Sequence, residues 1–171
     1  HAAHDIGHAL QNMALVGCSS FGVWNERTED STLLIGRNFD FYVGDHFAEN
    51  KIVMFVNPDS GHQFMMVTWG GMIGVVSGMN MQGLTITLNA AKSEIPTGSA
   101  TPVSILSREV LQYASTIDEA LKIIRGKKTF VSESFLIGSA KDGKAVNIEI
   151  TPDTVDIYET GLDQIVCTNH Y

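Results

Sequence analysis

The segments GCSSFGVW, at residues 17–24, and GRNFDF, at residues 36–41, hold the strongest structural signal in this chain. Both are apolar runs, and the polar stretch between them is typical of a turn, so together they predict a β-hairpin. Cys18 opens the first strand, and Arg37 and Asp40 stand on the second. Two adjacent strands can bring a nucleophilic sulfur, a cation and a carboxylate to one end of a sheet. This hairpin is therefore a candidate reactive centre.

Alternating apolar residues and turn signals predict further strands along the rest of the chain. Hairpin turns are indicated by PDSG at 58–61, NMQG at 80–83 and KDGK at 141–144. Many antiparallel strands with helices grouped between them indicate an α+β sandwich in one domain. The expected strands are residues 18–25, 32–39, 52–57, 63–69, 73–77, 84–89, 134–140, 145–150, 154–158 and 164–168.

Two helices are expected between these strands, where the apolar residues recur at helical spacing. The first has Thr101 as its N-cap and Pro102 as its first residue, since proline suits the first helical position. The second has Ser115 or Thr116 as its N-cap and Gly126 just after its last turn.

The composition bounds the function classes. The chain has 171 residues, 44% of them hydrophobic, which suffices for one domain with a buried core. A net charge of −8, with dispersed Lys and Arg, argues against nucleic acid as a partner. The apolar runs are too short to cross a bilayer. The two cysteines, Cys18 and Cys167, do not make a disulfide scaffold, although a bond between them would silence the nucleophile.

The residues around Cys18 suggest chemistry. Gly17 lets the backbone bend so that the sulfur can approach the preceding carbonyl, which is the geometry of an N→S acyl shift. Arg37 lies in an apolar run where an unpaired charge is costly, so a buried pair with Asp40 is expected. Such a pair would stabilise a thiolate or orient an amine. The alternatives are a packed structural cysteine and a surface ion pair of little energetic value.

Four motifs occur together in one order: the Gly-Cys start, the block at 36–41, GMNMQGL at 78–84 leading to LN at 88–89, and VCTN at 166–169. In this order the chain resembles the cysteine branch of the N-terminal-nucleophile hydrolases, which includes penicillin V acylase, bile salt hydrolase and acid ceramidase-like enzymes. The Gly-Cys junction inside a longer chain and the TNHY ending at 168–171 are most similar to the acyl-coenzyme A:6-aminopenicillanic acid acyltransferase group.

The resemblance implies an αββα sandwich, two antiparallel sheets between helical layers, of which this chain would form an incomplete domain. Residues 1–17 would be propeptide-like, and the apolar spacing predicts a helix at residues 3–16. Residues 18–171 would be the N-terminal part of the hydrolase domain. Related enzymes carry another arginine farther downstream, so the remaining part of the same chain is an expected partner.

The resemblance also implies roles for five residues. Cys18 matches the nucleophile, whose own α-amino group becomes the base once the preceding bond is cut. Asp40 matches the carboxylate that orients this amine and the thiol, and Arg37 matches the cation beside the nucleophile. Asn89 falls where these enzymes place an oxyanion-hole side chain, and Asn169 matches the asparagine that faces the nucleophile. The alternative for each asparagine is a strand-end residue that only satisfies a turn.

The implied activity begins with autoproteolysis of the Gly17–Cys18 bond. The enzyme would then hydrolyse a linear non-peptide amide, or transfer its acyl group, through a thioester on Cys18. Its partner would be a small-molecule amide or acyl substrate, and no metal or organic cofactor would be needed. Two alternatives remain: a non-catalytic binding or structural domain with the same sandwich, and a thiol hydrolase of another fold with His170 or His62 as base.

Residues of the central strands could line a substrate pocket. The candidates are Trp69, Met79, Asn80 and His170, the last because it follows Asn169 directly. Seven methionines occur in the chain, and a methionine-rich cleft could accept an acyl chain; core packing is the alternative explanation.

Three histidines near the N-terminus share one face of the expected first helix. His1, His4 and His8 have the i, i+3 and i+7 spacing that can hold a transition metal. Because no fourth ligand is evident, the sequence does not predict a metal site.

Overall fold

The structure is a computed structural model that describes residues 17–40, 46, 49–93 and 98–170. The helix expected at residues 3–16 and its three histidines lie outside these ranges. The elements are β1 (Ser19–Asn25), β2 (Ser31–Asn38), β3 (Lys51–Val56), β4 (Phe64–Trp69), β5 (Ser77–Asn80), β6 (Leu84–Ala90), α2 (Val103–Tyr113), α3 (Ile117–Arg125), β7 (Glu133–Ser139), β8 (Lys144–Ile150), β9 (Val155–Tyr158) and β10 (Gln164–Cys167).

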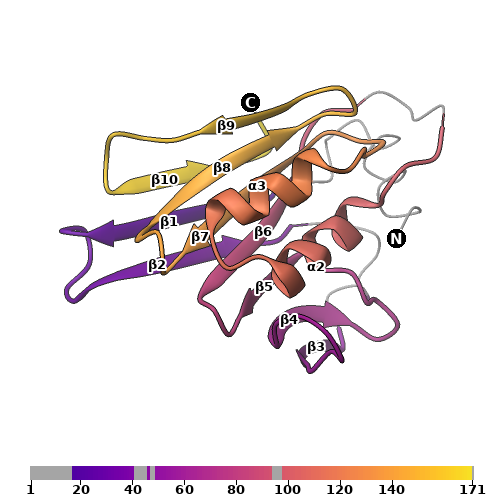
Figure 1. Cartoon of the computed structure of the whole chain (residues 1–171), viewed down its shortest axis with the longest axis horizontal. Helices are drawn as coiled ribbons and strands as arrows, with labels where there is room; N and C mark the ends of the chain where they lie inside the picture. The colour runs from indigo at the N-terminus through magenta and orange to yellow at the C-terminus, as the bar shows by residue number, and fades with distance from the viewer. Residues whose placement is uncertain (1–16, 41–45, 47–48, 94–97, 171) are drawn as a thin grey trace.

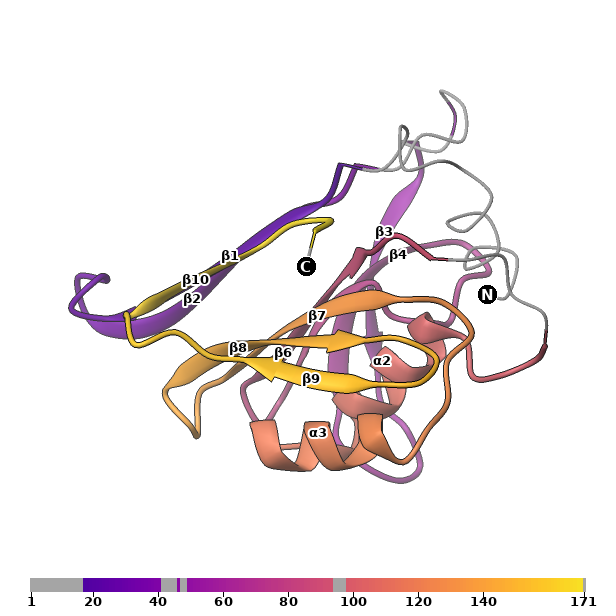
Figure 2. The ribbon, with the colours of Figure 1, turned by 90° about the horizontal axis from the view of Figure 1, so that it is seen from above.

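The strands form two antiparallel sheets that lie face to face. The small sheet has three strands in the order β10-β1-β2, so the last strand lies beside the N-terminal hairpin (Figure 1). The large sheet has seven strands in sequence order from β3 to β9. Figure 2 shows the small sheet and the two helices on opposite sides of the large sheet. The described residues thus form three layers of the implied αββα sandwich, and the expected antiparallel α+β fold is confirmed.

Two cores hold these layers together. Alternate residues of β6 and β7, among them Leu88 and Phe135, pack against the helices in the main core. A second core lies between the sheets and contains Trp24, Leu136 and Ile165. The sheets approach closely at Gly22, where an added Cβ would lie 3.0 Å from the Cβ of Ala145. A glycine at this point therefore allows the small sheet to rest directly on β8.

Nine of the ten expected strands are present with bounds that differ by one residue at most. The strand expected at residues 73–77 is wrong, because β5 begins only at Ser77. Val75 and Val76 are buried and belong to no strand. The N–H of Val75 donates to the carbonyl of Ser104 in α2 at 2.8 Å, and the carbonyl of Val76 accepts from the N–H of Leu88 in β6 at 3.0 Å. A short buried apolar run has the same pattern whether it forms a strand or a segment under a helix.

The two described helices differ in how their N-termini are capped. Thr101 is not the N-cap of α2; that position belongs to Pro102, whose φ of −57° and ψ of 134° are extended, and no side chain caps the helix. Thr116 is the N-cap of α3, as expected, and its hydroxyl oxygen accepts from the N–H of Glu119 at 3.3 Å. Gly126 follows the last turn, also as expected.

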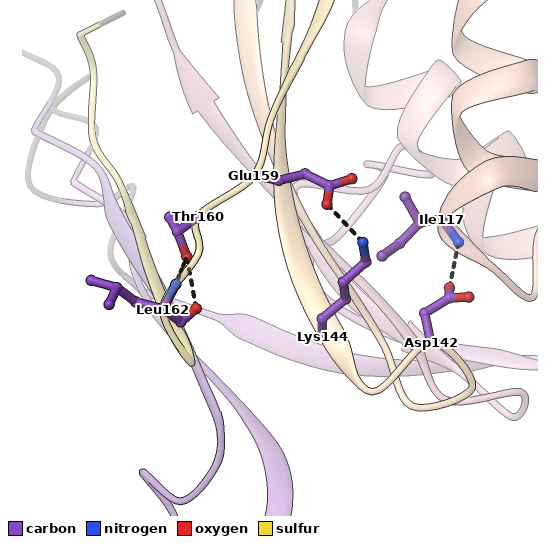
Figure 3. A network of polar contacts seen from close by, with 6 residues as sticks. All are labelled: Ile117, Asp142, Lys144, Glu159, Thr160 and Leu162. Atoms are coloured by element: carbon purple, nitrogen blue, oxygen red, sulfur yellow. Dashed lines mark hydrogen bonds and ion pairs between the residues drawn. The ribbon is translucent and has the colours of Figure 1, made fainter.

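Polar contacts fasten α3 and β9 to the turn between β7 and β8 (Figure 3). Asp142 in that turn accepts a hydrogen bond from the N–H of Ile117 at 2.8 Å, which places a carboxylate at the start of α3. Lys144 pairs with Glu159 at 2.7 Å, and both side chains are well exposed. Exposed ion pairs of this kind contribute little stability.

Asn80 closes the turn between β5 and β6. Its Nδ2 donates to the carbonyls of Leu111 and Ala114, at 2.8 and 2.7 Å, at the end of α2. Its Oδ1 accepts from the N–H groups of Gln82 and Leu84, each at 3.0 Å. The side chain is 3% exposed. These four bonds give Asn80 a structural role in the fold. It also lines the cavity that Met79 borders, and its expected role in binding substrate stays a prediction.

Replacing Asn80 with alanine should lower the free energy of unfolding by about 2–4 kcal/mol, because buried backbone groups lose their partners. Urea unfolding measures this loss. The matched control is Asn57→Ala in the β3–β4 turn, where an exposed Oδ1 accepts from Gln63 at 2.7 Å. That variant should stay within about 0.5 kcal/mol of the parent. Equal losses in the two variants would contradict the role given to Asn80.

Candidate active site

Cys18 lies directly before β1, where the chain passes the end of β2. Its side chain is 3% exposed and packs with Ala90 and Phe39. The sulfur lies 3.9 Å from the carbonyl oxygen of Asp40, and the N–H of Gly17 donates to the same oxygen at 3.1 Å. The peptide bond before Cys18 is therefore held against the residues that follow β2.

The carboxylate of Asp40 lies beside the residue before the nucleophile. Its Oδ2 accepts from Nδ2 of Asn38 at 2.6 Å, and it would lie 3.7 Å from a Cβ built on Gly17. Gly17 is not among the glycines with positive φ, and an alanine there would make only ordinary van der Waals contacts. The expected bend at Gly17 stays a prediction, whereas the expected proximity of Asp40 to the Gly17–Cys18 bond is present.

Arg37 and Asp40 form no ion pair in the described part of the chain, so the expected buried pair between them is wrong. Asp40 lies beyond the end of β2, and its carboxylate bonds to Asn38 instead. Asp40 is exposed, while the guanidinium of Arg37 reaches between the sheets and donates from Nη1 to Oδ1 of Asn89. Its Cζ lies 4.9 Å from the centre of the Phe39 ring. Its Nε and Nη2 are buried and have no hydrogen-bond partner in the described part of the chain.

Asn89, in β6, joins the two sheets at this point. Its Oδ1 accepts from Arg37 and from the hydroxyl of Ser20, the latter at 3.4 Å. Its Nδ2 donates to the carbonyls of Cys167 and Thr168, at 3.0 and 3.4 Å. A guanidinium can only donate, so the amide oxygen must face Arg37 and the amide nitrogen must face β10. Asn89 therefore anchors Arg37 in this arrangement, and its expected role as an oxyanion donor stays a prediction.

Asn169 follows β10 and reaches the same place from the other side. It is 9% exposed, and its Nδ2 donates to the carbonyl of Ala90 at 2.6 Å. This bond uses one of the two hydrogens on the amide nitrogen. Since Ala90 also packs against Cys18, the structure brings Cys18, Arg37, Asn89 and Asn169 to one end of the stacked sheets.

Burial and charge act in opposite directions on the thiol. Burial raises the pKa of Cys18 above its ordinary value, and this effect prevails. The charge of Arg37 lowers the pKa, as does the hydrogen bond to the backbone of Asp40, while the carboxylates of Glu133 and Asp40 raise it. Burial also lowers the pKa of Arg37. With Gly17 still attached, Cys18 is therefore a protonated thiol at neutral pH.

Glu133 belongs to this centre and was missed by the sequence analysis. It is fully buried at the start of β7, directly opposite Ala90 in the sheet. Its negative charge raises the pKa of both Cys18 and Arg37. The available signal was a single acidic residue at the beginning of the apolar run 134–140, where a buried charge needs an explanation.

Among the pocket candidates, only Trp69 is tied by a contact to the nucleophile's surroundings. Its ring lies 5.7 Å from that of Phe39, centre to centre, at an angle of 49°. Met79 pairs with Thr85, four residues before Asn89 and so about 13 Å away along β6. It lines a separate apolar cavity of about 300 Å³ near the β5–β6 turn. A role for Met79 in binding substrate stays a prediction.

The two histidines considered as alternative bases, His62 and His170, lie in different places. His62 lies 3.0 Å from the hydroxyl of Ser115, at the junction of α2 and α3. His170 is exposed and follows Asn169. Within residues 17–40, 46, 49–93 and 98–170, no histidine is hydrogen-bonded to Cys18, so a Cys–His pair has no support there.

Cys18 and Cys167 are both free, so the disulfide considered between them is not formed. Cys167 packs between the sheets, and its burial raises its pKa to about 11. No group of three or more His, Cys, Asp or Glu that could hold a metal occurs in the described part of the chain. No helix in that part is long and apolar enough to cross a membrane.

Comparison with known proteins gives relatives of greater length. An uncharacterized protein of Archaeoglobus fulgidus is 30% identical over 150 residues, which cover 85% of this chain and 25% of the relative. Protein dcd1B of Dictyostelium discoideum is 23% identical over 155 residues, which cover 89% of this chain and 31% of the relative. The chain thus spans between a quarter and a third of the length of these relatives.

Solved structures share the fold. An ortholog of N-acylethanolamine-hydrolyzing acid amidase from Caenorhabditis elegans superposes with a TM-score of 0.73 at 20% identity, over 90% of this chain and 70% of that one. A conjugated bile acid hydrolase from Clostridium perfringens superposes with a TM-score of 0.60 at 16% identity, over 89% of this chain and 53% of that one. Both neighbours have the N-terminal-nucleophile sandwich, so the fold inferred from the motifs is confirmed.

One family model matches most of the chain. It covers residues 26–171, beginning after Cys18 and including Arg37, Asp40, Asn89 and Asn169. Its description agrees with the group that the motifs indicated. The chain therefore belongs to the acyl-coenzyme A:6-aminopenicillanic acid acyl-transferase family.

Proposed function

We propose that the chain is the catalytic part of a cysteine enzyme that matures by cutting itself before Cys18. It then hydrolyses a linear non-peptide amide, or transfers its acyl group, through a thioester on that sulfur. The proposal is carried by the convergence of a thiol, a guanidinium and two amides at one end of the sheets. One structural neighbour is by name an amidase acting on N-acylethanolamines and another a hydrolase of conjugated bile acids, which supports the choice of amide substrates.

Maturation starts from the arrangement of Gly17 and Cys18 beside Asp40. The sulfur attacks the carbonyl carbon of Gly17, the C–N bond breaks, and the thiol proton passes to the released nitrogen. Water then hydrolyses the resulting thioester, which frees the segment that ends at Gly17 and leaves an α-amino group on Cys18. The carboxylate of Asp40 lies on the Gly17 side of Cys18, where it can hold this new amine.

The new amine supplies the base that the precursor lacks. An α-amino group has a pKa of roughly 7.7–8.0, so it can take the proton of the thiol near neutral pH. The thiolate of Cys18 attacks the substrate carbonyl and forms a tetrahedral intermediate. The protonated amine then gives its proton to the leaving nitrogen, the C–N bond breaks, and a thioester remains. Water or an acceptor amine resolves it, so that the acyl group is hydrolysed or transferred.

The negative oxygen of the tetrahedral intermediate needs donors, and two side chains can supply them. Asn169 has a second amide hydrogen besides the one given to Ala90. Arg37 carries N–H groups on Nε and Nη2 that have no partner among the described residues. Loss of one such donor typically slows acyl transfer about 10²–10³-fold. Asn89 contributes indirectly, because it fixes the guanidinium through Nη1.

The proposed activity is tested on the complete, processed protein that begins at Cys18. The substrate panel contains an N-acylethanolamine, a conjugated bile acid, an N-acylated 6-aminopenicillanic acid and, as the control, unblocked peptides. We expect turnover of at least one small amide and none of the peptides, with an acyl adduct on Cys18 trapped by rapid acid quench and located by mass spectrometry. Turnover without any adduct, or an inert protein with a free Cys18 amine, would remove the proposal.

A non-catalytic binding domain is the second candidate, and one observation favours it. The thiol of Cys18 is 3% exposed and its pKa is raised, as in an inert structural cysteine. Iodoacetamide at neutral pH separates the two candidates. Fast alkylation of Cys18 in processed protein supports an enzyme, and no alkylation after correct cleavage supports a binding domain.

A further inference from the structure

Among the described residues, no carboxylate is hydrogen-bonded to Arg37. Its side chain donates to the neutral amide of Asn89, and its Cζ lies over the Phe39 ring, 4.9 Å from the ring centre. A cation over an aromatic face is attracted by the negative potential of the ring. The ring itself is supported from the other side of the site by Trp69.

Phe39 also touches the nucleophile's cluster. It packs with Cys18 and Ala90, so a single ring lies against both the thiol and the guanidinium. Phe39 directly follows β2 and is two residues from Arg37, near the end of that strand. The ring and the guanidinium thus come from neighbouring positions of the chain and lie in contact.

We propose that Phe39 is a positioning residue, whose ring holds the Arg37 guanidinium beside Cys18 in place of a paired carboxylate. A hydrogen-bonded carboxylate would cancel much of the positive charge and occupy N–H groups of the guanidinium. The ring does neither. Asn89 accepts a hydrogen bond from Nη1 alone. The positive charge of Arg37 can therefore act on the sulfur of Cys18, and its Nε and Nη2 can donate to the acyl oxygen of a substrate.

Charged groups of the described residues act on both the thiol and the guanidinium. Cys18 is influenced by Arg37, by Asp40 at the end of β2 and by Glu133 in β7. Arg37 is influenced by the same two carboxylates and by Cys18 and Cys167. Within the described part of the chain, Arg37 is the one cation that acts on the sulfur, so displacing it leaves two carboxylates as the described charges there.

The test changes the electrostatics of the Phe39 ring without changing its shape. Phe39 is replaced by mono-, di- and trifluorophenylalanine, which weaken the negative potential of the ring face step by step. The readout is the rate of alkylation of Cys18 by iodoacetamide as a function of pH, with the modified cysteine located by peptide mapping. We expect the profile to move to higher pH along the series and the rate at neutral pH to fall about 2- to 5-fold in total.

The matched control is the same series at Phe55, an aromatic residue of β3 that is 79% exposed. It should leave the profile unchanged. A Phe39→Leu variant, which fills space without a ring, should shift the profile at least as far as trifluorophenylalanine. If the fluorinated series has no effect while Phe39→Leu does, the ring only fills space and the inference is overturned.

This inference concerns the centre of the proposed function, but its readout is the thiol alone. A protein that turns over no amide and still gives the graded shift would end the proposed activity and keep the role of Phe39. A protein that turns over amides but whose alkylation profile does not change along the fluorinated series would keep the proposed activity and end the role of Phe39.

Discussion

A Cys18→Ala protein is expected to stay whole and inactive, whereas the parent is expected to separate into a fragment ending at Gly17 and a chain beginning at Cys18. Alanine has no nucleophile to attack the preceding carbonyl or a substrate. Removal of a covalent nucleophile lowers kcat on the order of 10⁶-fold in a well-studied case. Intact-mass analysis measures the cleavage, and amide turnover measures the activity.

The control for this experiment is Cys18→Ser. A hydroxyl can replace the thiol in the acyl shift but is a weaker nucleophile at neutral pH, so slow cleavage and weak turnover are expected. The Cys18 side chain is small and buried, and both replacements should leave the fold intact. An alanine variant that is cut as fast as the parent would show that another agent makes the cleavage.

Replacing Arg37 with methionine should separate activity from stability. Arg37 lowers the pKa of Cys18, so without it the alkylation profile of the thiol moves to higher pH. We expect kcat/KM to fall about 10²–10³-fold, because the positive charge and its N–H groups are lost from the transition state. Burial lowers the pKa of Arg37, which means that the protein environment disfavours its charge. The lost hydrogen bond to Asn89 and the relieved cost of burying the charge act in opposite directions, so the free energy of unfolding should change by less than about 2 kcal/mol when an apolar side chain replaces Arg37.

Arg37→Lys is the matched variant. It keeps a positive charge, so the thiol profile should lie between those of the parent and of Arg37→Met. It cannot donate several N–H groups in a fixed plane, so kcat/KM should still fall. Urea unfolding of all three proteins provides the stability comparison. A methionine variant that loses stability in proportion to its activity would mean that Arg37 acts chiefly by holding the sheets together.

The hairpins of the large sheet and the two helices beside it could be predicted, because the sequence patterns that mark them are local. PDSG at 58–61 and KDGK at 141–144 mark tight turns, and the apolar alternation on either side sets the strands to within one residue. Thr116 and Gly126 mark the ends of a helix in the same way. The error at 73–77 has the opposite cause: the partner of that buried run is a helix far along the chain, which no local pattern reveals.

The centre was predictable in its membership and not in its contacts. Motif order placed Cys18, Arg37, Asn89 and Asn169 together, and the structure brings them to one end of the sheets. Closeness in sequence pairs Arg37 with Asp40, but Asp40 lies beyond the end of β2 and its carboxylate bonds to Asn38. The actual partner, Asn89, lies in the other sheet, and stacking of two sheets leaves no trace in the spacing of residues.

Because of the position of Asn89, the reactivity of the site depends on the stacking of the two sheets. One carboxamide spans β6, β2 and β10, so its bonds survive only while the two sheets remain stacked. If the two sheets moved slightly apart, the guanidinium of Arg37 would lose its bond to Asn89, while the backbone hydrogen bonds within each sheet would remain. As the temperature is raised, we therefore expect amide turnover to be lost at a lower temperature than the β-sheet signal in far-ultraviolet circular dichroism.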